Sequence, residues 1–214
     1  MTKHALIAWG GWEGHDPALC ADIIAGFLRA DGIATTLATG TTAFADPDLA
    51  RFDLIVPILS MTTIEKPELA NLLATIEAGT GLGGFHGGMA DSFRNEVAYQ
   101  FMVGGQWVAH PGNVIDYQVN ITRPDDPITA GIGDFSYTSE QYYMHVDPNN
   151  EVLATTLFTG AHAPWIDGHI IPVVWKRRHG KGRVFYSSLG HKAHEFQVSQ
   201  MAEITRRGLR WAMR

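Results

Sequence analysis

The chain has a single cysteine, Cys20, among its 214 residues, so an intrachain disulfide is excluded. Because Cys20 falls within an apolar pattern of helical spacing, we expect a buried thiol without a catalytic role. Long hydrophobic runs are also missing: none approaches the roughly 18 residues that a membrane span needs, so no membrane partner is expected. The opening Met-Thr-Lys-His has no signal-like pattern, and we expect a cytoplasmic protein.

Charge is scarce and leans acidic. Charged residues make up 18% of the chain, and 22 acidic against 16 basic side chains give a formal net charge of −6. This balance argues against nucleic acid and against anionic membranes as partners. Hydrophobic residues make up 45%, which is typical of a globular protein. The chain has no internal repeat, low-complexity tract or linker, so residues 1–214 are predicted to form a single domain.

The familiar catalytic signatures are absent as well. The sequence contains no HExxH, paired-cysteine, phosphate-loop or GxGxxG pattern. What it does contain is ten histidines. Histidine is the side chain suited to proton transfer near neutral pH, and it is also the commonest metal ligand. The histidines and the glycines beside them are therefore the place to look for chemistry.

The first half of the chain alternates between strand-like and helix-like patterns. Apolar runs typical of strands lie at His4–Trp9, Ile33–Ala38, Phe52–Leu59 and Gly81–Phe85, with helical spacing between them. This alternation predicts a parallel sheet with right-handed crossovers, in which ligands bind at the carboxyl ends of the strands. Further strands are predicted at Asn113–Thr122, Glu151–Thr156, His169–Lys176 and Arg183–Ser187. We therefore expect a three-layer α/β domain with a mostly parallel central sheet.

One glycine-rich stretch, residues 81–91, organises this prediction. A short apolar run leads through His86, which has glycine on its carboxyl side, into a helical segment. A strand, a sharp turn and a helix form a nucleophile elbow, whose apex side chain stands at the carboxyl edge of the sheet. Glycine avoids clashes there and tolerates positive φ. An imidazole at the apex indicates a base, an acid or a metal ligand; the alternative is a glycine-rich turn that happens to contain a histidine.

Two further residues complete the predicted catalytic group. His191 follows a predicted strand and Gly190, which repeats the setting of His86. Glu140 lies among tyrosines, where desolvation raises the pKa of a carboxyl group. We predict that His86, Glu140 and His191 are catalytic. The alternatives are a histidine held by the backbone and a solvated surface glutamate.

Substrate contacts and a metal are predicted around this group. His86 and His191, with Glu140 as a third donor, are candidate ligands of a divalent metal such as zinc, although their spacing alone gives this no support. Aromatic side chains would suit the apolar faces of a saccharide, and would equally suit a core. Asp91 and Arg94 lie one turn apart and could instead pair on the surface. The predicted substrate-binding residues are Trp12, His15, Asp91, Arg94, His110, Tyr142 and His145.

Six short motifs connect these residues with a known family. They are Gly10-Gly11 with Gly14-His15-Asp16; Gly81–Gly88 with Asp91 and Phe93-Arg94; Gly104-Gly105 with His110-Pro111; Glu140-Gln141-Tyr142; Pro172-Val173-Val174-Trp175; and Gly180–Tyr186 with Leu189-Gly190-His191. Together the motifs resemble the ThuA-like (trehalose-utilisation) family, a branch of the class I glutamine amidotransferase-like fold. The resemblance covers almost the whole chain.

The resemblance implies a flavodoxin-like sheet and a role in sugar metabolism. His86 stands where amidotransferases carry their cysteine, so thiol-based glutaminase activity is not expected. The family is linked to catabolism of trehalose and related disaccharides, beside a dehydrogenase that makes 3-keto sugars. The resemblance thus implies an isomerase or a lyase/hydrolase that acts on a 3-keto-disaccharide by His/Glu acid–base chemistry. A non-catalytic saccharide-binding or regulatory protein, and a metal-dependent hydrolase of an unrelated substrate, remain alternatives.

Self-association is a further expectation. Proteins of this fold commonly form homo-oligomers, and the aromatic-rich residues 135–143 are a candidate contact.

Overall fold

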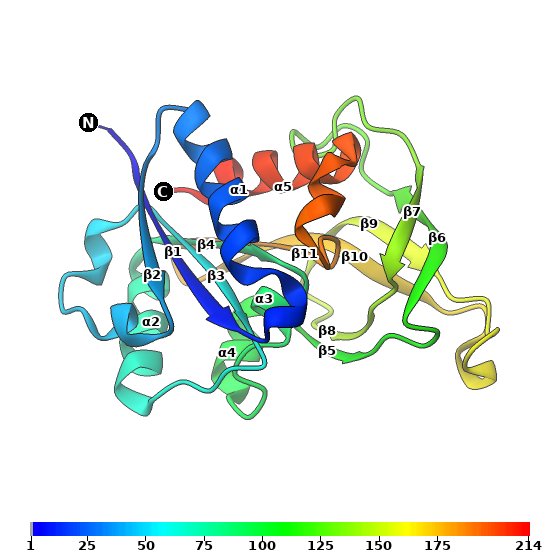
Figure 1. Cartoon of the computed structure of the whole chain (residues 1–214), viewed down its shortest axis with the longest axis horizontal. Helices are drawn as coiled ribbons and strands as arrows, with labels where there is room; N and C mark the ends of the chain where they lie inside the picture. The colour runs from blue at the N-terminus through cyan, green and yellow to red at the C-terminus, as the bar shows by residue number, and fades with distance from the viewer. Residues whose placement is uncertain (1) are drawn as a thin grey trace.

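Residues 2–214, which the computed structural model describes, are built around nine strands in the order β2-β1-β3-β4-β11-β10-β9-β6-β7 (Figure 1). The strands are β1 (His4–Gly11), β2 (Ala34–Thr39), β3 (Leu54–Ser60), β4 (Gly81–Phe85), β6 (Val114–Ile121), β7 (Phe135–Glu140), β9 (Glu151–Leu157), β10 (Ile170–His179) and β11 (Gly182–Ser187). A separate two-stranded sheet pairs β5 (Gly105–Ala109) with β8 (Tyr143–Val146). The sequence patterns did not predict these two short strands.

The sheet has a parallel and an antiparallel half. Strands β2, β1, β3, β4 and β11 are parallel neighbours, whereas β10, β9, β6 and β7 continue the sheet with antiparallel pairs. The predicted α/β fold is therefore confirmed, and the strands expected after residue 113 extend the same sheet. Every residue of β3 is buried, as its continuous apolar run predicts for a strand covered on both faces.

Helices cover both faces and complete three layers (Figure 1). Helices α1 (Pro17–Ala30) and α5 (Ser199–Ala212) lie on one face; α2 (Lys66–Ala78), α3 (His86–Ala90) and α4 (Val97–Val103) lie on the other. Alternate side chains of β1 point to opposite faces of the sheet and contribute to the cores on both sides. Ala5 and Ile7 belong to the core under α1 and α5, and Leu6 and Ala8 belong to the core under α2 and α4. No helix within residues 2–214 combines the length and the apolar character needed to cross a membrane.

The β6–β7 hairpin bends back over the parallel half. It joins β9 through only two pairs, Asn120 with Thr155 and Ile121 with Ala154. In a flat sheet β7 would lie about 24 Å from β4, at roughly 4.8 Å per strand. Instead, the Tyr137 hydroxyl of β7 accepts a hydrogen bond of 3.1 Å from the Gly190 backbone beyond β11. Strand β7 runs in the same direction as β4 and β11, so its carboxyl end reaches the same edge.

Most aromatic side chains of residues 135–143 are buried. Phe135, Tyr137 and Tyr142 are 6%, 2% and 3% exposed and pack in the protein's own core, whereas Tyr143 is partly exposed. Of the rings expected to form a contact, Tyr143 alone is therefore partly accessible. Self-association itself stays a prediction.

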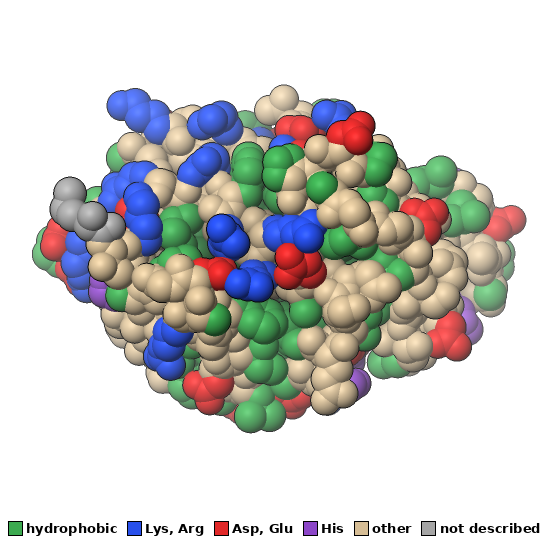
Figure 2. Space-filling model, turned by 90° about the horizontal axis from the view of Figure 1, so that it is seen from above, with side chains coloured by type: hydrophobic (Ala, Val, Ile, Leu, Met, Phe, Trp, Pro, Cys, Tyr) green, Lys and Arg blue, Asp and Glu red, His purple; other side chains and the backbone are tan. Residues whose placement is uncertain are grey.

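The α1 and α5 face carries mixed charge. Figure 2 views this face and shows Lys and Arg side chains interspersed with acidic ones. Arg206 of α5 makes a two-point contact with Asp31 at the end of α1, and Arg207 pairs with Glu203 one turn away at 2.7 Å. The two helices are thus joined by charge as well as by apolar packing.

Two glycine substitutions test the packing of these helices. Gly26 of α1 is exposed, and a Cβ there would have open space, so Gly26→Ala should raise the free energy of unfolding by about 0.5–1 kcal/mol through helix propensity. At Gly208 of α5 a Cβ would lie 2.2 Å from the Phe185 ring. Gly208→Ala should therefore destabilise the protein by about 1–3 kcal/mol. Urea unfolding measures both values; equal effects of the two substitutions would contradict this account of the α5 contact.

Candidate functional site

The elbow predicted around His86 is present at the junction of β4 and α3. His86 has φ 46°, in the left-handed region, so the strand turns sharply into the helix. Gly87 is required by close approach: a Cβ there would lie 2.6 Å from Cε1 of the His15 ring. A Cβ at Gly88 would lie 3.0 Å from Cα of Ile58 on β3. The glycines thus let a second histidine pack directly against the elbow.

Four buried side chains meet beside the elbow. His15, His86, Glu140 and His191 each offer one metal-ligating atom, and these atoms lie within 4.8 Å of one another. Nε2 of His86 is 3.1 Å from Glu140 Oε2, Nε2 of His15 is 4.0 Å from the same oxygen, and Nε2 of His191 is 3.6 Å from Oε1. These four residues are called the His/Glu centre below. They come from loops after β1, β4 and β11 and from the end of β7.

The outward ring nitrogens of two histidines are fixed by hydrogen bonds. His86 Nδ1 lies 2.8 Å from the Ser188 carbonyl oxygen, which can only accept, so this nitrogen carries a proton. His15 Nδ1 lies 2.6 Å from the Ser60 hydroxyl. Both rings are therefore oriented with Nε2 toward Glu140. This is the arrangement that outer partners impose on metal-binding histidines.

His191 is supported by a buried carboxylate. Glu195 accepts hydrogen bonds from the Tyr137 hydroxyl, from Ser139 Oγ at 3.0 Å and from the His191 backbone N–H at 3.0 Å. Its Oε1 also lies 3.9 Å from His191 Nδ1. The short 3₁₀ turn Ala193–Gln197 places Glu195 here, before helix α5 starts at Ser199. The same carboxylate therefore holds both the β7 hairpin and the His191 loop.

Burial sets the charge state of the centre. Burial, followed by the charges of His86 and His191, lowers the pKa of His15 to about 3. Burial and then the charge of His86 lower the pKa of His191 to about 4. Burial alone would raise the pKa of Glu140, but its hydrogen bond and charge interaction with His86 prevail and lower the pKa to about 2. At neutral pH His15 and His191 are thus neutral, and Glu140 is a carboxylate.

The donor set fits a divalent metal. Three imidazoles and one carboxylate form a nitrogen and oxygen set that zinc accepts, and neutral histidines are the form that binds. Zn–N and Zn–O bonds of about 2.0–2.2 Å place the ligand atoms of a tetrahedral site roughly 3.4 Å apart. His86 and His15 lie 3.1 and 4.0 Å from Glu140 Oε2, on either side of this value; His191 lies 3.6 Å from the other oxygen, and all four ligand atoms lie within 4.8 Å of one another. The sequence had suggested His86 and His191 as ligands, with Glu140 as a third donor, and the structure places His15 beside them.

A cavity of about 220 Å³, called the site cavity, reaches the His/Glu centre at His15 and Glu140; His86 and His191 are not among its lining residues. It includes six of the seven predicted substrate-binding residues. His145 is the exception: its backbone pairs with Gln106 in the β5–β8 sheet, and its side chain is exposed, away from the cavity. The lining residues are Trp12, His15, Met61, Asp91, Arg94, Trp107, His110, Glu140 and Tyr142.

Aromatic and charged groups shape the walls of the site cavity. The Tyr142 ring stacks on His86 with centroids 4.0 Å apart. Arg94 donates from Nε and Nη2 to both oxygens of Asp91, at 2.5 and 2.9 Å, and its guanidinium lies 5.0 Å from the centre of the Trp107 ring. Asp91 and Arg94, whose spacing also allowed a pair on the surface, therefore form part of the cavity wall.

Sequence reasoning assigned no site role to Ser60 or Met61. Both lie at or just after the end of β3, next to the elbow, and Ser60 is 2% exposed. Their position in a strand-end loop was the available signal, because the carboxyl edge of a parallel sheet gathers such loops.

The tautomer of His86 provides a direct test of this geometry. Because the Ser188 carbonyl can only accept, we expect a proton on Nδ1 that exchanges slowly with water. Long-range ¹H–¹⁵N spectra of labelled protein would report it, and His86→Gln would identify the signals by their loss. A ring nitrogen at Nδ1 without a proton would show that the elbow histidine points elsewhere.

Comparisons with known proteins agree with the fold and identify the family. A ThuA-like protein from Parabacteroides merdae ATCC 43184 superposes with TM-score 0.82 and 15% identity, covering 99% of this chain and 90% of that one. A ThuA-like protein from Bacteroides uniformis ATCC 8492 gives TM-score 0.80 and 20% identity over 98% and 91%. A cytoplasmic protein from Salmonella typhimurium LT2 gives TM-score 0.70 and 14% identity over 99% and 100%.

At these identities the solved structures show the fold alone. The comparison with curated proteins finds no match. The family model described as "ThuA: Trehalose utilisation" matches residues 4–212, and that range contains every residue of the His/Glu centre and of the site cavity. Since this match spans nearly the whole sequence, the chain belongs to the ThuA trehalose-utilisation family.

Proposed function

We propose that this protein is an enzyme of disaccharide catabolism that acts on a 3-keto sugar by acid–base chemistry. The observation that carries the proposal is the convergence of three buried imidazoles on the Glu140 carboxylate, beside a cavity that His15 and Glu140 line. Membership of a trehalose-utilisation family supports a saccharide substrate. The reaction class is isomerisation, or lyase or hydrolase cleavage of the glycosidic bond.

A ketone acidifies the neighbouring C–H bonds, so proton abstraction is the natural first step. His86 is the favoured base, because the Glu140 carboxylate 3.1 Å from Nε2 stabilises the imidazolium that forms. His191, with a pKa of about 4, is the weaker base of the two. Glu140 would return the proton to the enediolate or protonate the leaving glycosidic oxygen. Arg94 lines the cavity and would stabilise the enediolate charge.

The remaining walls suit a sugar ring. Trp12, at 48% exposure, lies in the cavity lining with Trp107 and Tyr142 and offers apolar ring faces for stacking. Asp91 and His110 supply hydrogen-bonding groups for hydroxyls. These side chains would orient the ketone toward the His/Glu centre.

We also propose, as an alternative to proton abstraction by His86, that His15, His86, Glu140 and His191 hold a divalent cation such as zinc, because Nε2 of His86 has one electron pair and cannot be base and ligand at once. When bound, such a cation would polarise a carbonyl oxygen and stabilise developing negative charge. The complete donor set also favours a second candidate function, a metal-dependent hydrolase of an unrelated ester or amide. A non-catalytic saccharide-binding or regulatory role is the third, because the same cavity would serve binding alone.

The proposal extends to location and partners. We place the protein in the cytoplasm, a view supported by the Salmonella typhimurium neighbour, which is named a cytoplasmic protein. The partner is a small saccharide rather than nucleic acid, and the chain is expected to form a homo-oligomer.

Hydrogen exchange tests the proposed chemistry. Incubation with 3-keto-trehalose in deuterated water should incorporate deuterium at the carbons beside the ketone, followed by mass spectrometry or NMR. His86→Gln should lower the exchange rate by about 100-fold or more, since general base catalysis contributes roughly 10²–10⁴-fold. His145→Gln, an exposed histidine outside the cavity, is the matched control and should exchange at the original rate.

Two other outcomes would decide against this enzyme. Tight binding of the keto sugar without exchange or turnover would indicate a binding protein. No interaction with keto sugars, combined with chelator-sensitive cleavage of esters or amides, would indicate the hydrolase.

Metal content tests the cation site independently. Protein purified with zinc and dialysed should retain about one equivalent by elemental analysis. His15→Ala and Glu140→Gln should each weaken zinc affinity by more than about tenfold, because even loss of an outer partner costs roughly 10–100-fold. His145→Gln should leave the affinity unchanged. Equal zinc binding by all four proteins would exclude the His/Glu centre as the metal site.

A further inference from the structure

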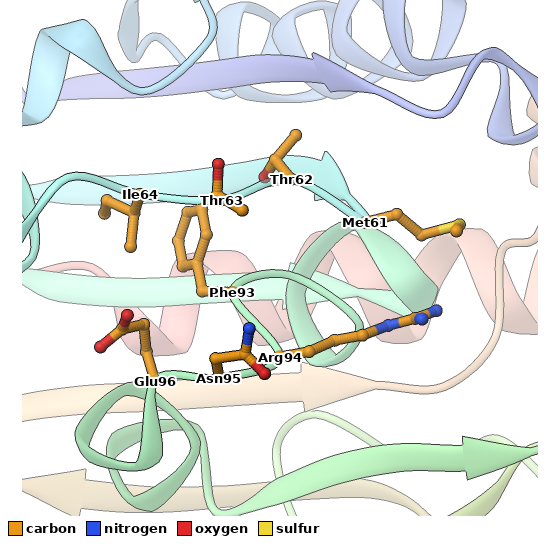
Figure 3. Close-up of a pocket in the computed structure, with 8 residues that line it drawn as sticks. All are labelled: Met61, Thr62, Thr63, Ile64, Phe93, Arg94, Asn95 and Glu96. Carbon is orange, nitrogen blue, oxygen red and sulfur yellow. The ribbon is translucent and has the colours of Figure 1, made fainter.

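A second cavity lies directly beside the site cavity. It has a volume of about 210 Å³ and sits between the loop after β3 and the loop that joins α3 to α4 (Figure 3). Met61 and Arg94 line both cavities, so these two side chains form the boundary between them. We call it the side cavity. Its lining residues are Met61, Thr62, Thr63, Ile64, Phe93, Arg94, Asn95 and Glu96.

The side cavity offers polar groups that are free to bind a ligand. The side chains of Thr63 and Asn95 are exposed and that of Glu96 is partly exposed, and Figure 3 shows them around one space, with the Phe93 ring among them. Phe93 and Ile64 are 1% and 9% exposed and form an apolar floor. A hydroxyl, an amide and a carboxylate over an apolar surface suit a neutral ligand with many hydroxyl groups. The Glu96 charge disfavours an anionic one.

The two walls are held in strained conformations. Met61 and Phe93 have φ of 59° and 51°, in the left-handed region that residues with a Cβ seldom adopt. Backbone hydrogen bonds of 3.0 Å connect the loops, from Met61 N–H to the Asp91 carbonyl and from Phe93 N–H to the Thr62 carbonyl. Strain of this kind persists where the surroundings impose it and concentrates at ligand clamps. The walls are therefore kept at a fixed separation.

The volumes of the two cavities favour one ligand that occupies both. Each alone, at about 220 and 210 Å³, falls below the roughly 300–1,000 Å³ of typical ligand sites, whereas the two together lie within that range. A ligand of two joined units would fill both, with its junction between Met61 and Arg94. A single sugar ring would leave one cavity filled by water alone.

We propose that the side cavity is the subsite for the second sugar ring, so that the protein selects keto-disaccharides over keto-monosaccharides. This inference rests on the proposed function for the identity of the ring in the site cavity. The Asn95 amide and the Thr63 hydroxyl would bind hydroxyl groups of the second ring, and Arg94 would contact the linkage between the rings.

Paired substrates and paired variants test the subsite. Turnover and calorimetric binding would be measured for 3-keto-trehalose and for 3-keto-glucose. Asn95→Ala should lower kcat/KM and affinity for the disaccharide by about threefold to tenfold, as expected for one lost uncharged hydrogen bond, and should leave the monosaccharide values unchanged. Asn95→Trp, which fills the side cavity from an exposed position, should lower the disaccharide values further and again spare the monosaccharide. Asn149→Ala, an exposed asparagine on another loop, is the control and should change neither.

The outcomes separate this inference from the proposed function. Turnover without preference for the disaccharide, or equal losses for both sugars in the Asn95 variants, would overturn the subsite and leave the enzyme standing. Discriminating binding without turnover would support the subsite and overturn the enzyme. Binding of neither sugar would overturn the subsite as well.

Discussion

The Glu140 carboxylate between buried imidazoles is the interaction on which the site depends. A carboxylate at 7% exposure would be costly without partners, and Nε2 of His86, 3.1 Å away, and the nearby His15, His110 and His191 provide them. The negative charge in turn orients the imidazole rings of His15, His86 and His191, whose Nε2 atoms all face Glu140. The result is a compact arrangement in which a proton or a cation can be held between fixed groups.

Two features of the fold produce this arrangement: the parallel direction of three strands and the bend of the β6–β7 hairpin. The loops after β1, β4 and β11 meet at one edge because these strands are parallel. The carboxylate arrives from the far border of the sheet, where the short β6–β9 pairing leaves the hairpin free to fold over. The Glu195 carboxylate then joins Tyr137 to the loop of His191. The geometry of the His/Glu centre thus depends on how the sheet curves.

The sequence predicts the fold and the elbow but not the bend of the hairpin. Local patterns predicted the fold and the elbow, because hydrophobic alternation and dense glycine around His86 act over a few residues. They grouped Glu140 with His86 and His191 but did not predict how it reaches them, because that depends on a bend set by pairing between residues more than thirty apart in sequence. The strands β5 and β8 were missed because they are only five and four residues long, too short for an alternating pattern to stand out. His145, predicted to contact substrate, lies in β8 with its side chain exposed and is not among the cavity's lining residues.

The bend of the hairpin has a consequence for how ligands and folding are connected. The His/Glu centre exists only when the antiparallel half of the sheet is closed against the parallel half, because Glu140 comes from one and His15, His86 and His191 from the other. Whatever binds there binds the closed form alone, and so resists opening of the hairpin by mass action. A ligand in the site would therefore hold the two halves of the sheet together. Protection of the β6–β7 amides from hydrogen exchange would then rise with ligand concentration.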